Sequence, residues 1–162
     1  MMADYNAWAN ARLFGMAGAL TDELYHQQVA AYFKSLHGTL NHILVADRIW
    51  MHRLTGSGEQ PSKLNAILFD DLFSLRVARA AEDSRIAEFV HSLAEPAFEE
   101  AVEYRMLNGT PVRQRRRDIL AHLFNHQTHH RGQSHAILTM LGVAEPEPLD
   151  LLLMQRQRTD QR

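Results

Sequence analysis

The sequence predicts an all-α protein folded as a four-helix bundle, in a single domain that spans residues 1–162. Four stretches of helix-forming residues carry apolar side chains at helical spacing, and Gly or Pro marks where most of them end. The links between these stretches are short, which is typical of a four-helix bundle. No internal repeat or long linker divides the 162 residues, so one domain is expected.

The first two predicted helices cover residues 3–20 and 33–54. Helix-forming Ala, Leu, Met and Arg fill the first, which places four larger side chains near one side: Tyr5, Trp8, Leu13 and Met16. A less regular link begins at Asp22. The second helix has a stripe interrupted by one carboxylate: Leu40, Ile43, Leu44, Asp47, Met51 and Leu54. Its predicted end is the polar, glycine-rich run 55–58, followed by a loop over 59–66.

A third helix is predicted over residues 69–93, before Pro96. Its apolar positions are Leu72, Leu75, Val77, Ile86, Phe89 and Val90. The period then changes, because Val102, Tyr104 and Met106 alternate with charged residues and a tight-turn pair, Asn108-Gly109, follows. That pattern predicts a short hairpin lying on the bundle before the last helix.

The fourth helix is predicted over residues 117–141, with Gly142 as its stop. Beyond it, four leucines occupy the carboxy-terminal tail: Leu149, Leu151, Leu152 and Leu153. Apolar side chains at this density favour packing, either on the bundle or on another subunit.

Composition excludes several classes of function. The chain has no cysteine, so a metal site must use nitrogen and oxygen ligands, and any reacting thiol must arrive with the substrate. A net charge of −2 argues against nucleic acid as the main partner. The one basic cluster (Arg113, Arg115, Arg116 and Arg117) is interpreted as a solvated helix entry rather than a phosphate site. No membrane-spanning run and no export signal are seen, which favours a cytoplasmic protein.

Histidines mark the candidate site. The stripe along the fourth helix reads Ile119, His122, His126, His130, Gln133 and Ile137. Because both ends of this stripe are apolar, its polar middle is expected to point into the bundle or a cleft. Buried imidazoles need polar partners, and one transition-metal ion would serve several at once.

A third ligand is expected from a facing helix. His42 is the strongest candidate because it lies at the edge of the second helix's apolar stripe, whereas His37 and His52 lie near the ends of that helix. The predicted triad is His42, His126 and His130. His122 lies two turns from His130, roughly 12 Å along the axis, so one ion cannot bind all three helix-four histidines.

Several neighbouring roles stay open. A pair of His122 with His126 is the alternative to the predicted pair, and His122 is otherwise interpreted as a core residue or one that supports the ligands. His129 and His135 lie off the stripe and are expected at the surface.

Asp47 and Trp50 are the other candidates beside the site. Asp47 could hold the second nitrogen of a ligand, pair with an arginine, or be a partly exposed acid at a groove edge. Trp50 is either a core residue or one wall of a pocket, two turns beyond His42. No general base stands out.

Two runs of residues resemble a known family. They are His122-Leu-Phe-Asn-His126-Gln-Thr-His129-His130-Arg131-Gly132-Gln133 and Leu40-Asn41-His42-Ile43-Leu44-Val45-Ala46-Asp47-Arg48-Ile49-Trp50. Together with the opening run 5–10 and the Leu-Gly-Val-x-x-Pro pattern after the last helix, they resemble the DinB/YfiT-like family of helical-bundle metalloproteins. The resemblance covers nearly the whole chain and implies that the ligands are His42, His126 and His130.

The same resemblance implies a four-helix bundle, frequent homodimers, and zinc or nickel as the metal. Characterised relatives include thiol-dependent transferases and isomerases that use low-molecular-weight thiols. A three-histidine site leaves the ion at +2, which lowers the pKa of a bound water or thiol. A metal-dependent transferase or hydrolase acting on a small molecule is therefore expected. The alternatives are a non-catalytic metal-binding stress-response module and a helical interaction protein.

Overall fold

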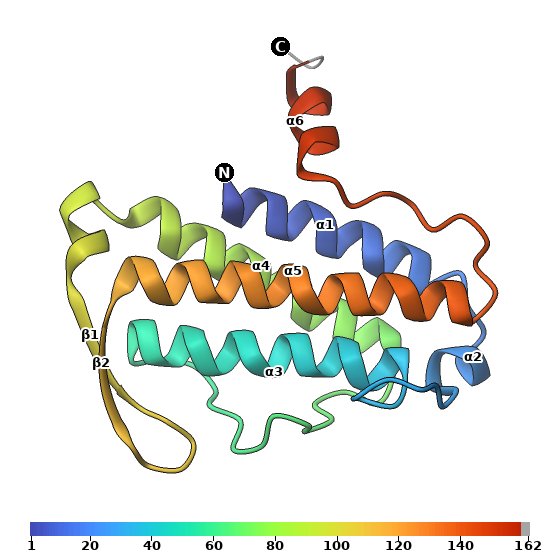
Figure 1. Cartoon of the computed structure of the whole chain (residues 1–162), viewed down its shortest axis with the longest axis horizontal. Coiled ribbons are helices and arrows are strands. Elements are labelled where there is room, and N and C mark those ends of the chain that lie inside the picture. Colours follow the sequence, from blue (N-terminus) through green and yellow to red (C-terminus); the bar gives the residue numbers. More distant parts are fainter. Residues whose placement is uncertain (160–162) are drawn as a thin grey trace.

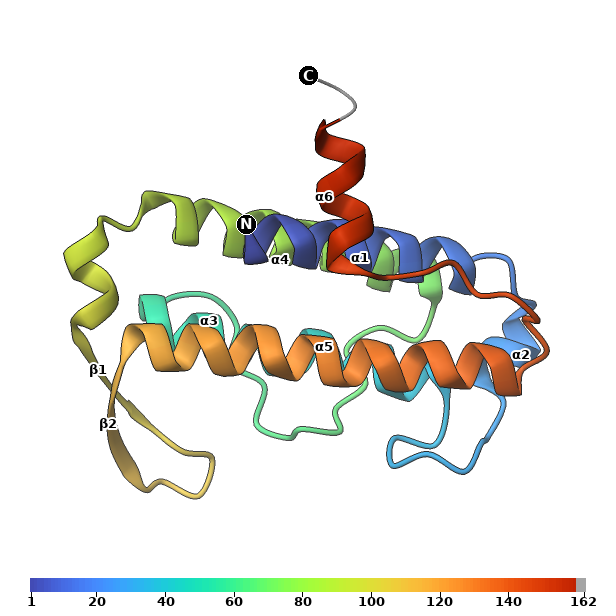
Figure 2. The ribbon, with the colours of Figure 1, turned by 45° about the horizontal axis from the view of Figure 1, so that its top comes forward.

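The computed structural model describes residues 1–159 and is dominated by four long helices (Figure 1). They are α1 (Met2–Ala17), α3 (Leu36–Thr55), α4 (Leu72–Ser92) and α5 (Arg116–Met140). Helices α1 and α3 each pack against both α4 and α5, and Figure 2 shows α1 and α4 as one layer over α3 and α5. This arrangement confirms the predicted four-helix bundle. Residues 160–162 of the predicted domain lie outside the described residues.

Capping side chains decide where two of these helices begin. Ser35 accepts a hydrogen bond from the backbone N–H of Gly38 (2.9 Å) and so caps α3. Asp71 caps α4 by accepting one from Ser74 N–H (2.8 Å). Such bonds satisfy amide groups that the first helical turn leaves without partners. Both helices therefore begin three residues later than predicted.

Two short helices were not predicted. The link after α1 contains α2 (Asp22–His26), capped by Thr21, whose hydroxyl accepts from Leu24 N–H (3.3 Å). The leucine-rich tail forms α6 (Leu151–Thr159), which points away from the bundle in both views. Helices this short depend on tertiary contacts rather than on sequence periodicity, and Met154 supplies one by packing on α1.

The predicted hairpin is present at one end of the bundle. It follows a 3₁₀ turn, η1 (Glu95–Glu99), and pairs β1 (Ala101–Arg105) with β2 (Pro111–Arg115) in antiparallel register. Gly109 adopts a φ of 85°, as the tight turn requires. Val102 and Tyr104 are half-buried and pack against the bundle, which stabilises a hairpin that would be marginal alone.

The core has two large apolar clusters, one at each end of the bundle, and a small third one where Met154 of α6 packs on Tyr5 and Ala9 of α1. The first includes Leu13, Leu40, Leu75 and Ile137, and the second, beneath the hairpin, includes Ala3, Met51, Ile86 and Leu123. Between them, all four long helices contribute buried polar side chains, here called the polar layer: Asn6, Asn10, Asp47, Arg79, Asp83, Gln127 and Arg131.

Two further features of the helices bear on the predictions. Val77 was placed on the apolar side of α4, but its side chain is 56% exposed, so this prediction was wrong. The inward face of α4 uses Arg79 and Asp83 instead, and Val77 falls on the opposite side. Within residues 1–159, no helix combines the length and the apolar character needed to cross a membrane.

Candidate metal centre

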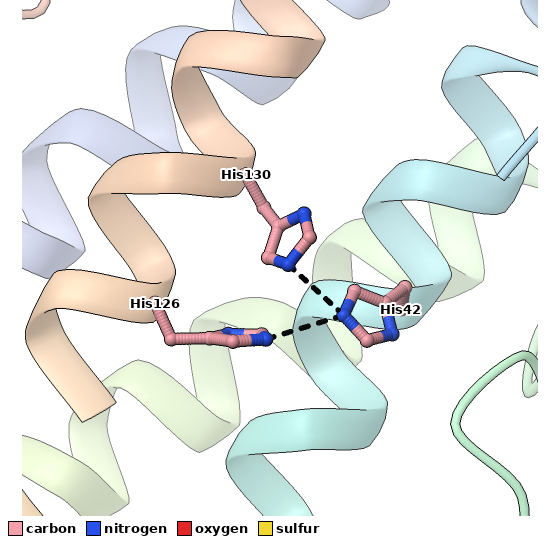
Figure 3. Close-up of side chains that lie close together, drawn as sticks. All are labelled: His42, His126 and His130. Carbon is pink, nitrogen blue, oxygen red and sulfur yellow. Dashed lines mark hydrogen bonds between the residues drawn. The ribbon is translucent and has the colours of Figure 1, made fainter. Parts of the chain in front are cut away.

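Three histidines from two helices converge beside the polar layer (Figure 3). His126 and His130 lie one turn apart on α5, so their side chains share a face. Residues 127 and 131, their neighbours in sequence, turn inward to the polar layer instead. Helix α3 packs against α5 and presents His42 to the pair. The structure thus brings together the three residues of the predicted triad.

The distances within this triad suit a single small cation. The Nε2 atom of His42 lies 3.2 Å from Nε2 of His126 and 3.2 Å from Nε2 of His130. Candidate ligand atoms of all three residues lie within 4.8 Å of one another. A tetrahedral zinc ion with bonds of about 2.0–2.1 Å spaces its ligands about 3.3 Å apart. The two distances from His42 are close to that value.

Hydrogen bonds fix the orientation of two of the rings. His42 Nδ1 lies 2.7 Å from the carbonyl oxygen of Leu64, and His130 Nδ1 lies 2.7 Å from Oε1 of Gln133. Since both partners are acceptors, each Nδ1 carries the proton and each Nε2 presents a lone pair to the centre. Two lone pairs 3.2 Å apart repel each other unless a cation lies between them. This donor set therefore fits a metal ion.

Burial keeps these imidazoles neutral. Burial, with a smaller effect of the neighbouring imidazoles, lowers the pKa of His126 to about 3 and that of His130 to about 4, although the hydrogen bond to Gln133 opposes the shift of His130. Burial also lowers the pKa of His42, although the hydrogen bond to Leu64 opposes this. Neutral imidazole is the form that binds a transition metal. The triad is thus ready to bind a cation at neutral pH.

An aromatic side chain covers the triad on one side. The ring of Phe33 stacks on His42 with a centroid distance of 3.9 Å, and it meets His130 edge-on at 5.7 Å. The backbone of Phe33 lies so close to α3 that a Cβ at Gly38 would be only 2.2 Å from the Phe33 carbonyl oxygen. Glycine at position 38 therefore allows this segment to reach the site.

Asp47 belongs to the polar layer rather than to the triad. Its Oδ2 accepts a hydrogen bond from Arg79 Nη1 (2.7 Å) and another from Gln127 Nε2. Of the three roles considered for Asp47, pairing with an arginine is the one observed. The Asp47 side chain is fully buried rather than partly exposed. Burial raises the pKa of Asp47, and the Arg79 guanidinium opposes that shift.

The rest of the polar layer was not predicted. Asp83 accepts hydrogen bonds from Nδ2 of Asn6 (3.0 Å) and of Asn10 (2.9 Å), and its Oδ1 lies 3.0 Å from Arg79 Nη2. Arg131 donates to the side chains of Asn6 and Gln127. The negative charges of two carboxylates are therefore matched by the positive charges of two guanidiniums in the core. The sequence does carry one sign of the polar layer, namely three pairs of polar residues spaced i,i+4 on helices: Asn6/Asn10, Arg79/Asp83 and Gln127/Arg131.

His122 lies outside both the triad and the core. It is exposed, and its ring meets Trp50 edge-on at 4.9 Å. The prediction of a core position was wrong because each four-residue step turns a helix about 40° beyond a full turn. Two such steps carry His122 away from the face of His130. Burial against its neighbours and the positive charge of Arg53 lower its pKa.

The other histidines of α3 and α5 lie outside the triad. His129 is exposed and His135 is half-buried, with its ring 3.1 Å from the carbonyl oxygen of Glu147. His37 and His52 contact backbone carbonyls of Phe69 and Gly58, in agreement with their exclusion from the triad.

The arginine cluster around residue 115 forms ion pairs with nearby glutamates. Arg113 pairs with Glu103 of β1, and the other three pair with acids at the end of η1: Arg115 and Arg117 with Glu99, and Arg116 with Glu100. Most of these side chains are exposed to solvent, which agrees with the interpretation of the cluster as a solvated helix entry.

A pocket with a volume of about 460 Å³ opens directly beside the triad. His42 and His126 form part of its wall, and most of the other lining side chains are apolar, among them Ala46, Ile49, Trp50, Leu64, Tyr104 and Met106. Trp50 thus forms a pocket wall, one of the two roles expected for it. A volume of this size suits a small organic molecule. It is called the triad pocket below.

Comparison with known proteins identifies the chain's relatives. The model of the DinB family matches residues 1–161. The chain belongs to the DinB family. Protein DinB from Bacillus subtilis (strain 168) is 24% identical over 145 residues, which cover 87% of this chain and 84% of that relative. The resemblance of the two sequence runs to this family is therefore confirmed.

Two solved structures share the DinB fold. A DinB-like protein from Bacillus cereus ATCC 10987 superposes with a TM-score of 0.64 at 19% identity, covering 83% of this chain and 87% of that one. A DinB-like protein from Bacillus subtilis gives 0.66 at 12% identity, covering 92% and 97%. Family membership and the three-histidine cluster together allow a metal-binding site in this DinB chain.

Proposed function

We propose that this protein is a divalent-metal-dependent enzyme in which His42, His126 and His130 hold zinc or nickel. One observation carries the proposal. Nε2 lone pairs of neutral imidazoles converge at the wall of an apolar pocket large enough for a small organic substrate. Catalytic zinc sites commonly use three protein ligands and keep one further position for water or substrate.

The proposed reaction is either transfer of a low-molecular-weight thiol or hydrolysis. A divalent ion held by three neutral imidazoles stays at +2 and lowers the pKa of a bound water or thiol. The chain's own residues provide the surroundings: Phe33 covers His42, and Trp50 with Ile49 keeps water from one side of the substrate. His122 is neutral at pH 7 and lines the pocket, so it is the candidate that accepts a proton there. Asp47 is not a candidate for this proton transfer, because it lies in the polar layer.

A non-catalytic role is the second candidate, either as a metal-binding stress-response protein or as a helical interaction protein. The burial of His42 and His130 beside the polar layer favours it, since a bound ion would tie α3 to α5 and stabilise the bundle. The two candidates differ in what metal removal would change. In the non-catalytic protein it would lower only the stability, because there is no turnover to lose.

We also propose that the protein is a cytoplasmic homodimer. Helix α6 projects from the bundle and leaves Leu152 55% exposed, as expected of a surface that meets a second copy. Light scattering of the purified chain, compared with a Leu152→Glu variant, tests the assembly.

Elemental analysis beside a turnover assay tests the proposed function. The purified chain should carry about one zinc or nickel per protomer, and it should conjugate small thiols with electrophiles or hydrolyse esters or amides. A chelator should abolish turnover, and the metal should restore it. A metal-bound protein that turns over neither substrate class would refute the enzyme. Chelation that lowers only the melting temperature would establish the second candidate.

A further inference from the structure

The triad pocket contains a single cationic side chain. Arg53, at the carboxy-terminal end of α3, is the one lysine or arginine that lines it. Its guanidinium lies 4.5 Å from the ring centroid of Trp50 and 4.8 Å from that of Tyr104, and these two rings meet each other edge-on with centroids 5.5 Å apart. Two cation–π contacts therefore hold the guanidinium against the corner that these rings form, and within residues 1–159 none of its N–H groups donates a hydrogen bond to the protein.

Arg53 has no anionic partner within residues 1–159. None of the ion pairs formed by that part of the chain includes it. Its Nε is buried without a hydrogen-bond acceptor. The core residue Arg79 also has a buried Nε without an acceptor, but unlike Arg53 it pairs with two carboxylates. Burial also lowers the pKa of Arg53, and the neighbouring Tyr104 opposes that shift. A buried donor without a partner carries a free-energy cost that a bound acceptor would remove.

The positions of Arg53 and the triad define an elongated site. His42, Ala46, Ile49 and Arg53 follow one another at helical spacing, so they line one face of α3. Eleven residues separate the first from the last, which corresponds to roughly 16 Å along the axis. The Arg53 side chain shortens this span because helical side chains lean toward the amino terminus. The wall between the two ends is apolar.

We infer that the triad pocket binds an elongated carboxylate, with the carboxylate on Arg53, an apolar or aromatic body along Ile49 and Trp50, and the reacting group at the triad. The last part rests on the proposed function, whereas the carboxylate site does not. A carboxylate suits Arg53 better than a phosphate because its two oxygens match the planar edge of one guanidinium. A phosphate dianion would find no second lysine or arginine in this lining.

Binding of phenylbutyrate and of its neutral amide to the metal-stripped full-length chain tests the carboxylate site. Stripping the metal prevents the carboxylate from binding there. The acid should bind at least about tenfold more tightly than phenylbutyramide, as expected for a charge-assisted pair. Calorimetry measures both affinities. Equal affinities, or no binding of either compound, would overturn the inference.

Variants then assign the preference to one side chain. Arg53→Gln should bring the affinities for acid and amide within about twofold of each other. Arg76→Gln removes an exposed arginine of α4 outside the triad pocket, and it should keep the wild-type preference. A preference that survives Arg53→Gln would overturn the assignment. The acid–amide comparison in wild type decides the question even if that variant fails to fold.

A second series connects the two ends of the site. In cobalt-loaded protein, ω-mercapto carboxylates of increasing chain length should produce a thiolate-to-metal absorption band at lower concentrations than the matching mercapto alcohols. The difference should peak at one chain length and disappear in Arg53→Gln. Absence of the band with every thiol would count against the proposed function alone, since the phenylbutyrate result does not depend on the metal. A band with no preference for acids would count against Arg53 alone.

Discussion

Replacing Arg79 with methionine should remove a large part of the stability of the bundle. Arg79 is only 2% exposed, and its guanidinium lies 2.7 Å from Asp47 and 3.0 Å from Asp83. Methionine fills similar space without a charge, so both carboxylates lose their counter-charge in the core. Breaking a buried ion pair on one side costs about 3–5 kcal/mol. A domain is stable by only about 5–15 kcal/mol in total.

Urea unfolding of the metal-free chain, followed by circular dichroism, measures this loss. With a slope of about 2 kcal/mol/M, a loss of about 3–5 kcal/mol lowers the midpoint by about 1.5–2.5 M. Arg76→Met, an exposed position on the same helix, should change the unfolding free energy by less than about 0.5 kcal/mol.

A compensating variant tests whether the loss comes from unpaired charge. Adding Asp47→Asn to Arg79→Met leaves one carboxylate, Asp83, and one guanidinium, Arg131, in the polar layer, so more than half of the lost stability should return. A loss below about 1 kcal/mol for Arg79→Met, or no recovery in the double variant, would show that the polar layer does not act as one charge-balanced unit.

Three further predictions follow from the site. His126→Ala should lower the zinc content from about one ion per protomer to nearly none, whereas His135→Ala, which changes a histidine outside the triad, should keep it; equal contents would contradict the triad. The metal-free chain should lose stability as the pH falls from about 6.5 to about 4. The folded His126 and His130 have pKa values of about 3 and about 4, below the ordinary 6.5, so only the unfolded chain takes up those protons. Urea midpoints that stay constant over this pH range would show that the two imidazoles are not buried in this way. Gly38→Ala should cost about 1–3 kcal/mol because its Cβ meets a carbonyl oxygen, whereas Gly132→Ala in α5, where the Cβ meets nothing, should gain about 0.5–1 kcal/mol; thermal unfolding compares the two.

Periodicity and ligand chemistry predicted the bundle and the residues that converge in it. The i,i+4 spacing of His126 and His130 fixed their common face, and the apolar stripe around Ile43 placed His42 opposite them. The alternation of Val102 and Tyr104 predicted the hairpin. These features depend on local geometry, which a sequence carries directly.

Features that depend on contacts between distant segments were missed. Seven polar residues from four helices meet in the polar layer, and the level at which each helix crosses the others is not encoded in any single stretch. Asp47 could not be assigned among its three roles for this reason, since its partner Arg79 lies 32 residues away. His122 was misplaced because a stripe of four-residue steps winds around the helix.

The triad and the pocket beside it have different structural origins. Two packed helices, α3 and α5, hold the imidazoles, whereas Leu64 and Tyr104 in the outer wall come from a loop and from the hairpin. Loops and hairpin tips accept insertions and substitutions that packed helices do not. Proteins that share this scaffold can therefore differ in the outer wall of the pocket while they keep the same three histidines. Grafting a hairpin from one DinB family member to another is thus a direct way to change the pocket without touching the helices that hold the triad.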